Sequence, residues 1–144
     1  MAVSITFTMI KPTAVKSNFT GSILKMINDK GFRIKAIKMI QLTRERAEAF
    51  YAIHKGKLFF DGLVEYMSSG PVIAAILEKE NAVEDYRRLI GNTDPVKAES
   101  GTIRKMFAES IERNAVHGSD SDENAEKECD FFFAKSERFS KFED

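Results

Sequence analysis

The sequence has one cysteine, no tryptophan and only three prolines among 144 residues, and its charges cancel. A single thiol, Cys129, excludes an internal disulfide and a cysteine-based zinc site. Because 22 basic residues balance 22 acidic ones, no net charge draws the chain towards nucleic acid or an anionic membrane. We therefore expect no stable nucleic-acid complex, and any binding of phosphate must depend on a local cluster of cations.

Long apolar segments are also missing. No apolar run reaches the roughly 20 residues that span a bilayer, and the first six residues lack the basic segment and apolar stretch of a signal peptide. A free thiol is typical of a reducing compartment, so we expect a cytoplasmic protein. The apolar share of 43% and charged share of 31% are ordinary for a globular chain of this length, which predicts one domain over 1–144.

Hydrophobic spacing alternates between the periods of strands and helices. It predicts strands over 3–10, 32–39, 72–77 and 131–133, and helices over 19–30, 43–53, 59–67, 82–90 and 120–127. The alternation over 32–39 slips once, which indicates a bulge, and the unbroken apolar run over 72–77 is typical of a strand buried on both faces. This order predicts a sheet with helices packed on it but leaves parallel and antiparallel pairing open.

Two local signals complete the predicted organisation. Asp120 and Glu123 have the spacing of a capping box, which predicts that a helix begins at Asp120. The stretch from 91 to about 115 is too long for a tight connection, and loops of that length in compact domains are usually functional or disordered.

His117 is the first candidate for chemistry because it stands just before the predicted start of that helix. A helix N-terminus stabilises anions, and a neutral imidazole is a nucleophile near pH 7 that can carry a phosphoryl group. A histidine in such a place is more often a surface residue, so spacing alone leaves both interpretations open.

The candidates for binding phosphate are Lys11 at a strand exit, Arg87 beside the apolar stripe of a helix, and Arg104 in the long loop. Thr93 adds a possible hydroxyl donor. Each is individually more typical of a solvated surface residue, and no spacing brings them together. Tyr51, Phe59 and Phe60 are at helical spacing, which favours core packing over a platform for a base.

The segment 114–121, Asn-Ala-Val-His-Gly-Ser-Asp-Ser, resembles the active-site signature of the nucleoside diphosphate kinase family. Further similarities follow in the family's order along nearly the full length, over 6–12, 59–64, 67–72, 91–95, 101–104 and 121–128. The resemblance implies an α+β, ferredoxin-like fold, a βαββαβ antiparallel four-stranded sheet covered by helices, with an inserted loop near the active site. It also implies a homo-oligomer, either a tetramer or a hexamer.

The reaction implied by the resemblance is a ping-pong transfer with broad base specificity. A nucleoside triphosphate gives its γ-phosphate to His117, and the phosphohistidine gives it to a nucleoside diphosphate. Glu128 and Ser119 orient the histidine. The residues implied to bind the nucleotide or its phosphates are Lys11, Tyr51, Phe59, Arg87, Thr93, Arg104 and Asn114. Mg²⁺ is expected as a bridge between phosphates, with Asp120 at most an indirect contact.

The chain departs from the family's usual pattern at Thr13, Ser100, Lys105 and Met106, none of which has an implied chemical role. Two alternatives remain: a phosphohistidine phosphotransferase acting on proteins, and a non-catalytic interaction module. The module is disfavoured because every position implied to touch the nucleotide is intact.

Overall fold

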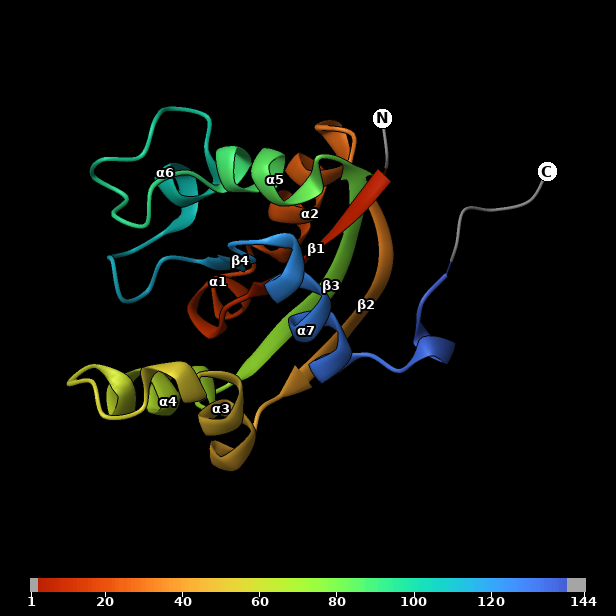
Figure 1. The fold of residues 1–144 in the computed structure, drawn as a ribbon. Coiled ribbons are helices and arrows are strands. Elements are labelled where there is room, and N and C mark those ends of the chain that lie inside the picture. The colour runs from red at the N-terminus through yellow and green to blue at the C-terminus, as the bar shows by residue number, and fades with distance from the viewer. Residues whose placement is uncertain (1–2, 140–144) are drawn as a thin grey trace.

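The computed structural model describes residues 3–139, and its centre is a four-stranded antiparallel sheet (Figure 1). The strands are β1 (Val3–Ile10), β2 (Arg33–Gln41), β3 (Pro71–Glu80) and β4 (Val116–Gly118), in the order β2-β3-β1-β4. This confirms the antiparallel, ferredoxin-like arrangement that the resemblance implies.

Helices lie on both faces of the sheet. They are α1 (Pro12–Lys16), α2 (Thr20–Asp29), α3 (Arg44–Phe50), α4 (Phe60–Met67), α5 (Ala82–Ile90), α6 (Ile103–Phe107) and α7 (Asp122–Phe132), with short 3₁₀ helices over Ala52–His54 and Lys135–Glu137. In Figure 1, α3 and α4 lie together at one end of the sheet, while α2 and α5 lie at the other.

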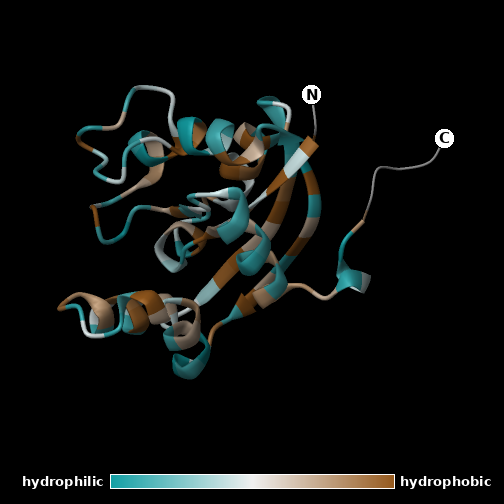
Figure 2. Cartoon of the chain, viewed as in Figure 1, coloured by the Kyte–Doolittle hydropathy of each residue, from teal (hydrophilic) through white to brown (hydrophobic). Residues whose placement is uncertain are grey.

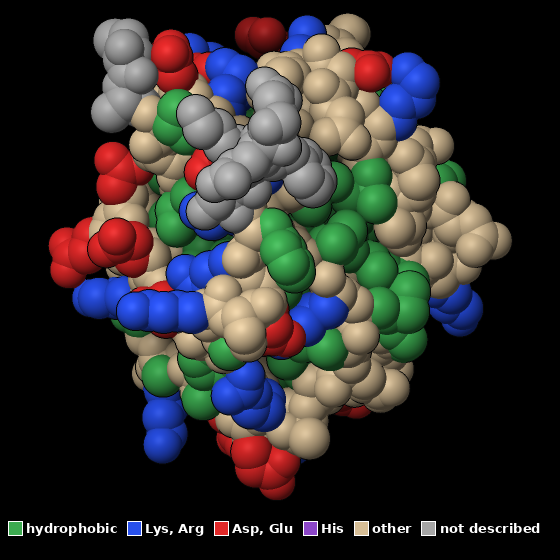
Figure 3. All heavy atoms as spheres, turned by 90° about the vertical axis from the view of Figure 1, so that its right-hand side faces the viewer, with side chains coloured by type: hydrophobic (Ala, Val, Ile, Leu, Met, Phe, Trp, Pro, Cys, Tyr) green, Lys and Arg blue, Asp and Glu red, His purple; other side chains and the backbone are tan. Residues whose placement is uncertain are grey.

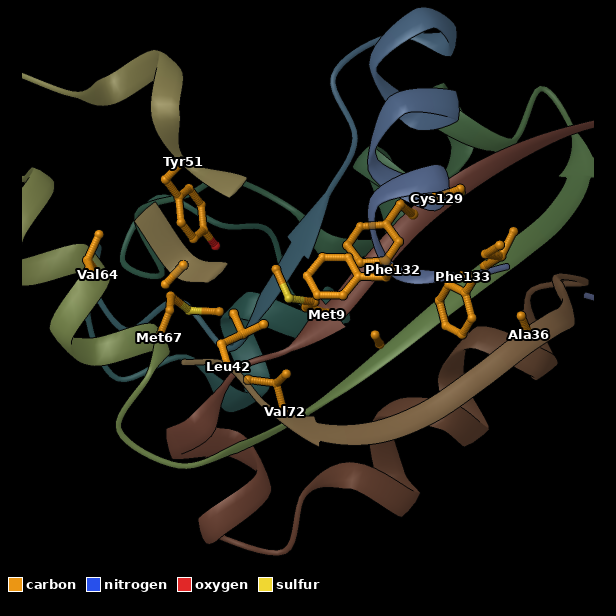
Figure 4. Close-up of a cluster of buried hydrophobic side chains, with 14 of the residues drawn as sticks. Met9, Ala36, Leu42, Tyr51, Val64, Met67, Val72, Cys129, Phe132 and Phe133 are labelled. Carbon is orange, nitrogen blue, oxygen red and sulfur yellow. The ribbon is translucent and has the colours of Figure 1, made fainter. Parts of the chain in front are cut away.

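Strand β3 shows why the two faces have separate cores. Its residues 72–77 are all buried, which confirms the strand predicted to be buried on both faces. Because side chains alternate along a strand, Val72, Ala74 and Ile76 pack with α3, α4 and α7. Ile73, Ala75 and Leu77 pack with α2 and α5 on the other face. In Figure 2, brown, hydrophobic residues recur along the strands and on the helices that cover them. Figure 4 shows the first of these two clusters.

Several predicted elements are confirmed. The first strand and the helices over 19–30, 59–67 and 82–90 are present within one or two residues of their predicted limits. The predicted bulge in the second strand lies between Ile34 and Ala36, where the pairing with β3 shifts its register.

The predicted strand over 131–133 is wrong. Phe131 and Phe132 are the last residues of α7, and the fourth strand is instead the short segment Val116–Gly118. Three consecutive aromatic residues suit a strand locally. However, Ala125, Cys129 and Phe132 share one buried face at helical spacing, so burial of that face keeps the segment helical.

The predicted capping box at Asp120 is also wrong. Helix α7 begins at Asp122, and its cap is Ser121, whose hydroxyl accepts a hydrogen bond from the Asn124 N–H at 3.1 Å. Serine is among the best N-cap residues. Asp120 accepts a hydrogen bond from the Asn124 side-chain amide at 2.6 Å instead.

Candidate active site

Strand β4 places His117 opposite Met9 at the edge of the sheet. Alternation along the strand buries Val116 in the core beside α5 and turns the His117 ring to the opposite face, where it lies near Phe7. A Cβ at position 118 would lie 2.9 Å from Ile90 Cδ1, so glycine allows β4 to approach α5 this closely.

Hydrogen bonds from the neighbouring strand fix the backbone of His117. The Thr8 hydroxyl donates to the His117 carbonyl at 2.7 Å. The Tyr86 hydroxyl lies 2.6 Å from the same Thr8 oxygen, and it is the donor there because Thr8 has only one hydroxyl proton. Tyr86 of α5 therefore holds the His117 carbonyl in place through Thr8 of β1.

The His117 ring is oriented by a carboxylate. Nε2 lies 2.9 Å from Glu128 Oε1, and the Ser119 hydroxyl donates to the same oxygen at 2.7 Å. Ser119 is fully buried and accepts from the Phe7 N–H at 3.1 Å. Because an ionised carboxylate only accepts, Nε2 carries the proton, and Nδ1 of the neutral ring keeps its lone pair. Helix α7 thus contacts His117 through Glu128, which lies inside the helix.

Lys11 and Asn114 form a buried pair. The Lys11 ammonium donates to Asn114 Oδ1 at 2.7 Å, and the Lys11 N–H donates to the Ala115 carbonyl at 2.8 Å. Burial, and to a lesser degree the charge of Arg104, lowers the pKa of Lys11 to about 7. Ala115 has a φ of +73°, a left-handed conformation that costs a non-glycine residue on the order of 1 kcal/mol or more.

Arg104 combines structural bonds with a free donor. Its guanidinium donates to the Gly91 carbonyl at 3.1 Å and to the Val116 carbonyl at 2.9 Å. Its Nε is buried and has no hydrogen-bond partner among the described residues. Burial is the main reason why its pKa falls to about 10, and the nearby charge of Arg87 lowers it further. Two cations, Lys11 and Arg104, are therefore held close to the strand that carries His117.

The remaining candidates differ in exposure. Tyr51 is buried, its hydroxyl points inward (Figure 4), and that hydroxyl has no hydrogen-bond partner among the described residues. Burial raises its pKa, and the Glu128 carboxylate adds to that effect. Phe59 is 51% exposed, so the prediction from spacing that it belongs to the core is wrong, whereas Tyr51 and Phe60 are buried.

The structure therefore brings some of the predicted site residues into contact and leaves others apart. His117, Ser119 and Glu128 are in direct contact, Lys11 contacts Asn114, and Arg104 bonds the carbonyl just before His117. Arg87, Thr93 and Asp120 are exposed on an adjoining helix and loops. Spacing did not identify Thr8 and Tyr86 as supports of His117.

The departures from the family's pattern have local roles or are exposed. The Thr13 hydroxyl lies 2.7 Å from that of Tyr66, which joins α1 to α4. Ser100, Lys105 and Met106 are exposed. Within residues 3–139, no three His, Cys, Asp or Glu side chains gather in a group that could hold a metal ion. No helix in that range is long and apolar enough to cross a membrane.

Comparison with known proteins agrees with this geometry. A sequence model described as nucleoside diphosphate kinase matches residues 4–138. The curated nucleoside diphosphate kinase of Flavobacterium psychrophilum is 55% identical over 139 residues, covering 96% of this chain and 100% of the relative. The chain belongs to the nucleoside diphosphate kinase family. It is therefore an enzyme, with the kinase activity of that family.

Solved structures support the same assignment. The nucleoside diphosphate kinase of Aquifex aeolicus, 43% identical, superimposes with a TM-score of 0.93 over 95% of this chain and 99% of that one. The enzyme of Halobacterium salinarum, solved in complex with CDP, is 35% identical, with a TM-score of 0.94 over 99% of this chain and 95% of that one.

The lowered pKa of Lys11 predicts a pH-dependent stability. The unfolded chain keeps this lysine protonated up to its ordinary pKa of 10.5, whereas the folded chain releases the proton near pH 7. Between these values the unfolded state binds more protons, so folding becomes more favourable as the pH rises, by on the order of 1 kcal/mol per pH unit. Lys11→Met removes this dependence.

Urea unfolding of the wild type and Lys11→Met at pH 7, 8 and 9 measures the difference. The free energy of unfolding of Lys11→Met minus that of the wild type should decrease as the pH rises. The lost bond to Asn114 shifts this difference by the same amount at every pH. Lys16→Met, which removes an exposed lysine from α1, the helix that follows Lys11, should leave the slope unchanged. Parallel curves for the wild type and Lys11→Met would show that Lys11 keeps an ordinary pKa.

Proposed function

We propose that this chain transfers the γ-phosphate of a nucleoside triphosphate to a nucleoside diphosphate through a phosphohistidine at His117. The observation that carries the proposal is the bond from His117 Nε2 to Glu128 at 2.9 Å. It leaves the Nδ1 lone pair free for attack, and the carboxylate stabilises the positive charge that develops on the ring.

The transfer then runs in two balanced steps. Nδ1 attacks the γ-phosphorus, the bond from that phosphorus to the β,γ-bridging oxygen breaks, and the diphosphate leaves with the electron pair. A β-phosphate oxygen of a second diphosphate then attacks the phosphohistidine. The N–P bond breaks, and its electron pair returns to Nδ1. Because one site serves donor and acceptor in turn, the kinetics are ping-pong.

Phosphoryl transfer depends mainly on positioning and on neutralising charge, and the site offers cations for both. We assign Lys11, Arg87 and Arg104 to the phosphates, with the Thr93 hydroxyl as a further donor. The free Nε of Arg104 and the unpartnered hydroxyl of Tyr51 suit phosphate oxygens. Lys11 and Asn114, already paired at 2.7 Å, are assigned to the sugar 3′-hydroxyl. An anionic nucleotide would raise the lowered pKa of Lys11 and keep it charged.

Phe59 is assigned to the base. The residue is 51% exposed, and stacking on its ring requires no hydrogen bond to a base edge, so every base can bind. This supports broad base specificity. The Halobacterium salinarum relative was solved with CDP, a pyrimidine nucleotide.

Magnesium is proposed as an ion that the nucleotide carries. The described residues contain no three-residue cluster of metal-binding side chains, which suits an ion held mainly by phosphate oxygens and water. Asp120 is exposed, and its Oδ1 already accepts from Asn124, so its proposed role is indirect. The ion would neutralise charge on the phosphates.

We further propose that residues 1–144 form one kinase domain and that the protein is cytoplasmic, a location that suits the free thiol of Cys129.

We also propose that the chain forms a homo-oligomer. Hydrophobic side chains gather among charged ones on the face shown in Figure 3. On the outer strand β2, Ile37 is 45% and Met39 is 61% exposed, which suits a contact between subunits. Sedimentation that finds only monomers at micromolar concentration would contradict a tetramer or hexamer.

Labelling tests the phosphohistidine directly. With Mg²⁺ and γ-labelled ATP, the chain should acquire an acid-labile, base-stable label, and added GDP should discharge that label as GTP. His117→Ala should acquire none. Failure of the wild type to label, or equal labelling of His117→Ala, would contradict the proposal. A label that proteins accept but GDP does not would favour the protein phosphotransferase instead.

Arg87 and Arg88 provide a matched test of the phosphate site. Both are exposed neighbours on α5, but Arg88 forms ion pairs with Glu84 and Asp85. Arg87→Ala should lower kcat/KM by about tenfold, or about 1.4 kcal/mol, because a charge-assisted bond to phosphate is lost. Arg88→Ala should leave kcat/KM unchanged. Equal effects of the two substitutions in steady-state assays would remove Arg87 from the site.

A further inference from the structure

Two phenylalanine rings lie against the imidazole of His117. Phe50 meets it at 5.5 Å between ring centroids with an interplanar angle of 73°, a T-shaped contact. Phe7 meets it at 5.9 Å and 57°. Edge-to-face contacts of this kind favour one relative orientation of the two rings. Phe50 therefore touches the reactive ring itself, from an element other than the strand that carries it.

Phe50 is the last residue of α3 and lies in a cluster of aromatic rings. Its centroid is 5.2 Å from that of Phe132, 5.4 Å from that of Phe131 and 4.9 Å from that of Tyr51. The cluster joins the end of α3 to the end of α7, the helix that provides Glu128. The position of Phe50 is therefore set by the same helix that orients Nε2.

A second contact fastens α3 to α7. The Arg46 guanidinium donates to the Phe131 carbonyl at 2.9 Å and lies 4.1 Å from the centroid of the Phe131 ring. A cation over an aromatic face adds attraction to the hydrogen bond. Phe50, one helical turn after Arg46, is thus held at a fixed place against α7.

The hydrogen bond to Glu128 holds only one ring nitrogen of His117, and the ring could still swing about the line from Cβ to Nε2, which would displace Nδ1. In-line attack requires the Nδ1 lone pair to point along the breaking P–O bond, and a misplacement of about 1 Å can cost on the order of a hundredfold in rate. A contact on the ring itself is needed to restrict that swing, and Phe50 provides one.

We propose that Phe50 is a positioning residue for phosphoryl transfer, which holds the His117 imidazole in the orientation that directs Nδ1 at the phosphate. The proposal rests on the proposed function. Phe50 acts through His117 and makes no bond to the nucleotide, so its loss lowers the rate of transfer and leaves nucleotide binding unchanged.

Two substitutions isolate this role. Phe50→Met keeps an apolar side chain of similar length without the ring, and Phe50→Tyr keeps the ring at a half-buried position. Phe19→Met is the matched control, because Phe19 is also a half-buried phenylalanine and its ring contacts Phe107 in the core on the other face of the sheet. Unfolding curves identify which variants fold, and Phe50→Leu replaces Phe50→Met if the latter does not.

The rate of His117 phosphorylation in a single turnover should fall roughly tenfold or more in Phe50→Met, with KM for both nucleotides unchanged. Phe50→Tyr should retain most of the wild-type rate, and the control Phe19→Met should retain all of it. ¹⁵N NMR of the unliganded chain provides an independent measure. The wild type should show His117 protonated at Nε2, whereas Phe50→Met should show shifted and broadened imidazole signals, because its ring samples further orientations.

The proposal is overturned if folded Phe50→Met phosphorylates His117 at the wild-type rate with unchanged imidazole shifts, or if Phe19→Met slows transfer as much as Phe50→Met. A wild type that never acquires the label would instead overturn the phosphohistidine mechanism. The NMR comparison, which needs no nucleotide, would still determine whether Phe50 orients the ring.

Discussion

The pairing of β4 with β1 is the constraint on which the site depends. Only three residue pairs form it, and so short a strand has little stability of its own. Contacts on both sides compensate: Thr8 bonds the His117 carbonyl, and Gly118 lies against Ile90 and Tyr86. Strand alternation then directs His117 towards α7 and Val116 towards α5, so one short strand serves both the chemistry and the core.

The same backbone connects His117, the proposed nucleophile, to the cations. Arg104 bonds the Val116 carbonyl, and the Lys11 N–H bonds the Ala115 carbonyl. A shift of β4 would therefore move His117, Lys11 and Arg104 together. The left-handed conformation of Ala115 is a local cost that this network of bonds offsets. We interpret it as the geometry that brings Asn114 back to the Lys11 ammonium.

Sequence patterns predicted the parts of the fold that have strong periodicity. Strands β1 and β3 are rich in apolar residues over several positions, and α5 has a distinct apolar face. The three residues of β4 have no such pattern, because His117 and Gly118 do not favour strands. The aromatic run at 131–133 imitated a strand, and only the buried face shared with Ala125 and Cys129 reveals a helix.

Local sequence patterns predicted less of the site than of the fold. Its residues come from β1, α3, α5, α6, β4, α7 and the loops beside them, and no spacing along the chain brings these elements together. The family resemblance supplied the partners of His117. It did not indicate that Phe50 contacts the imidazole or that Tyr86 supports Thr8, because those roles depend on how the helices pack.

The position of the phosphate on the His117 ring tests the account most directly. Because Glu128 engages Nε2, the phosphorylated chain should carry its phosphate on Nδ1, with the proton retained on Nε2. ³¹P and ¹⁵N NMR of the phosphorylated protein distinguishes the two isomers. Phosphate on Nε2 would contradict the account, since it would require the bond between His117 and Glu128 to break before transfer.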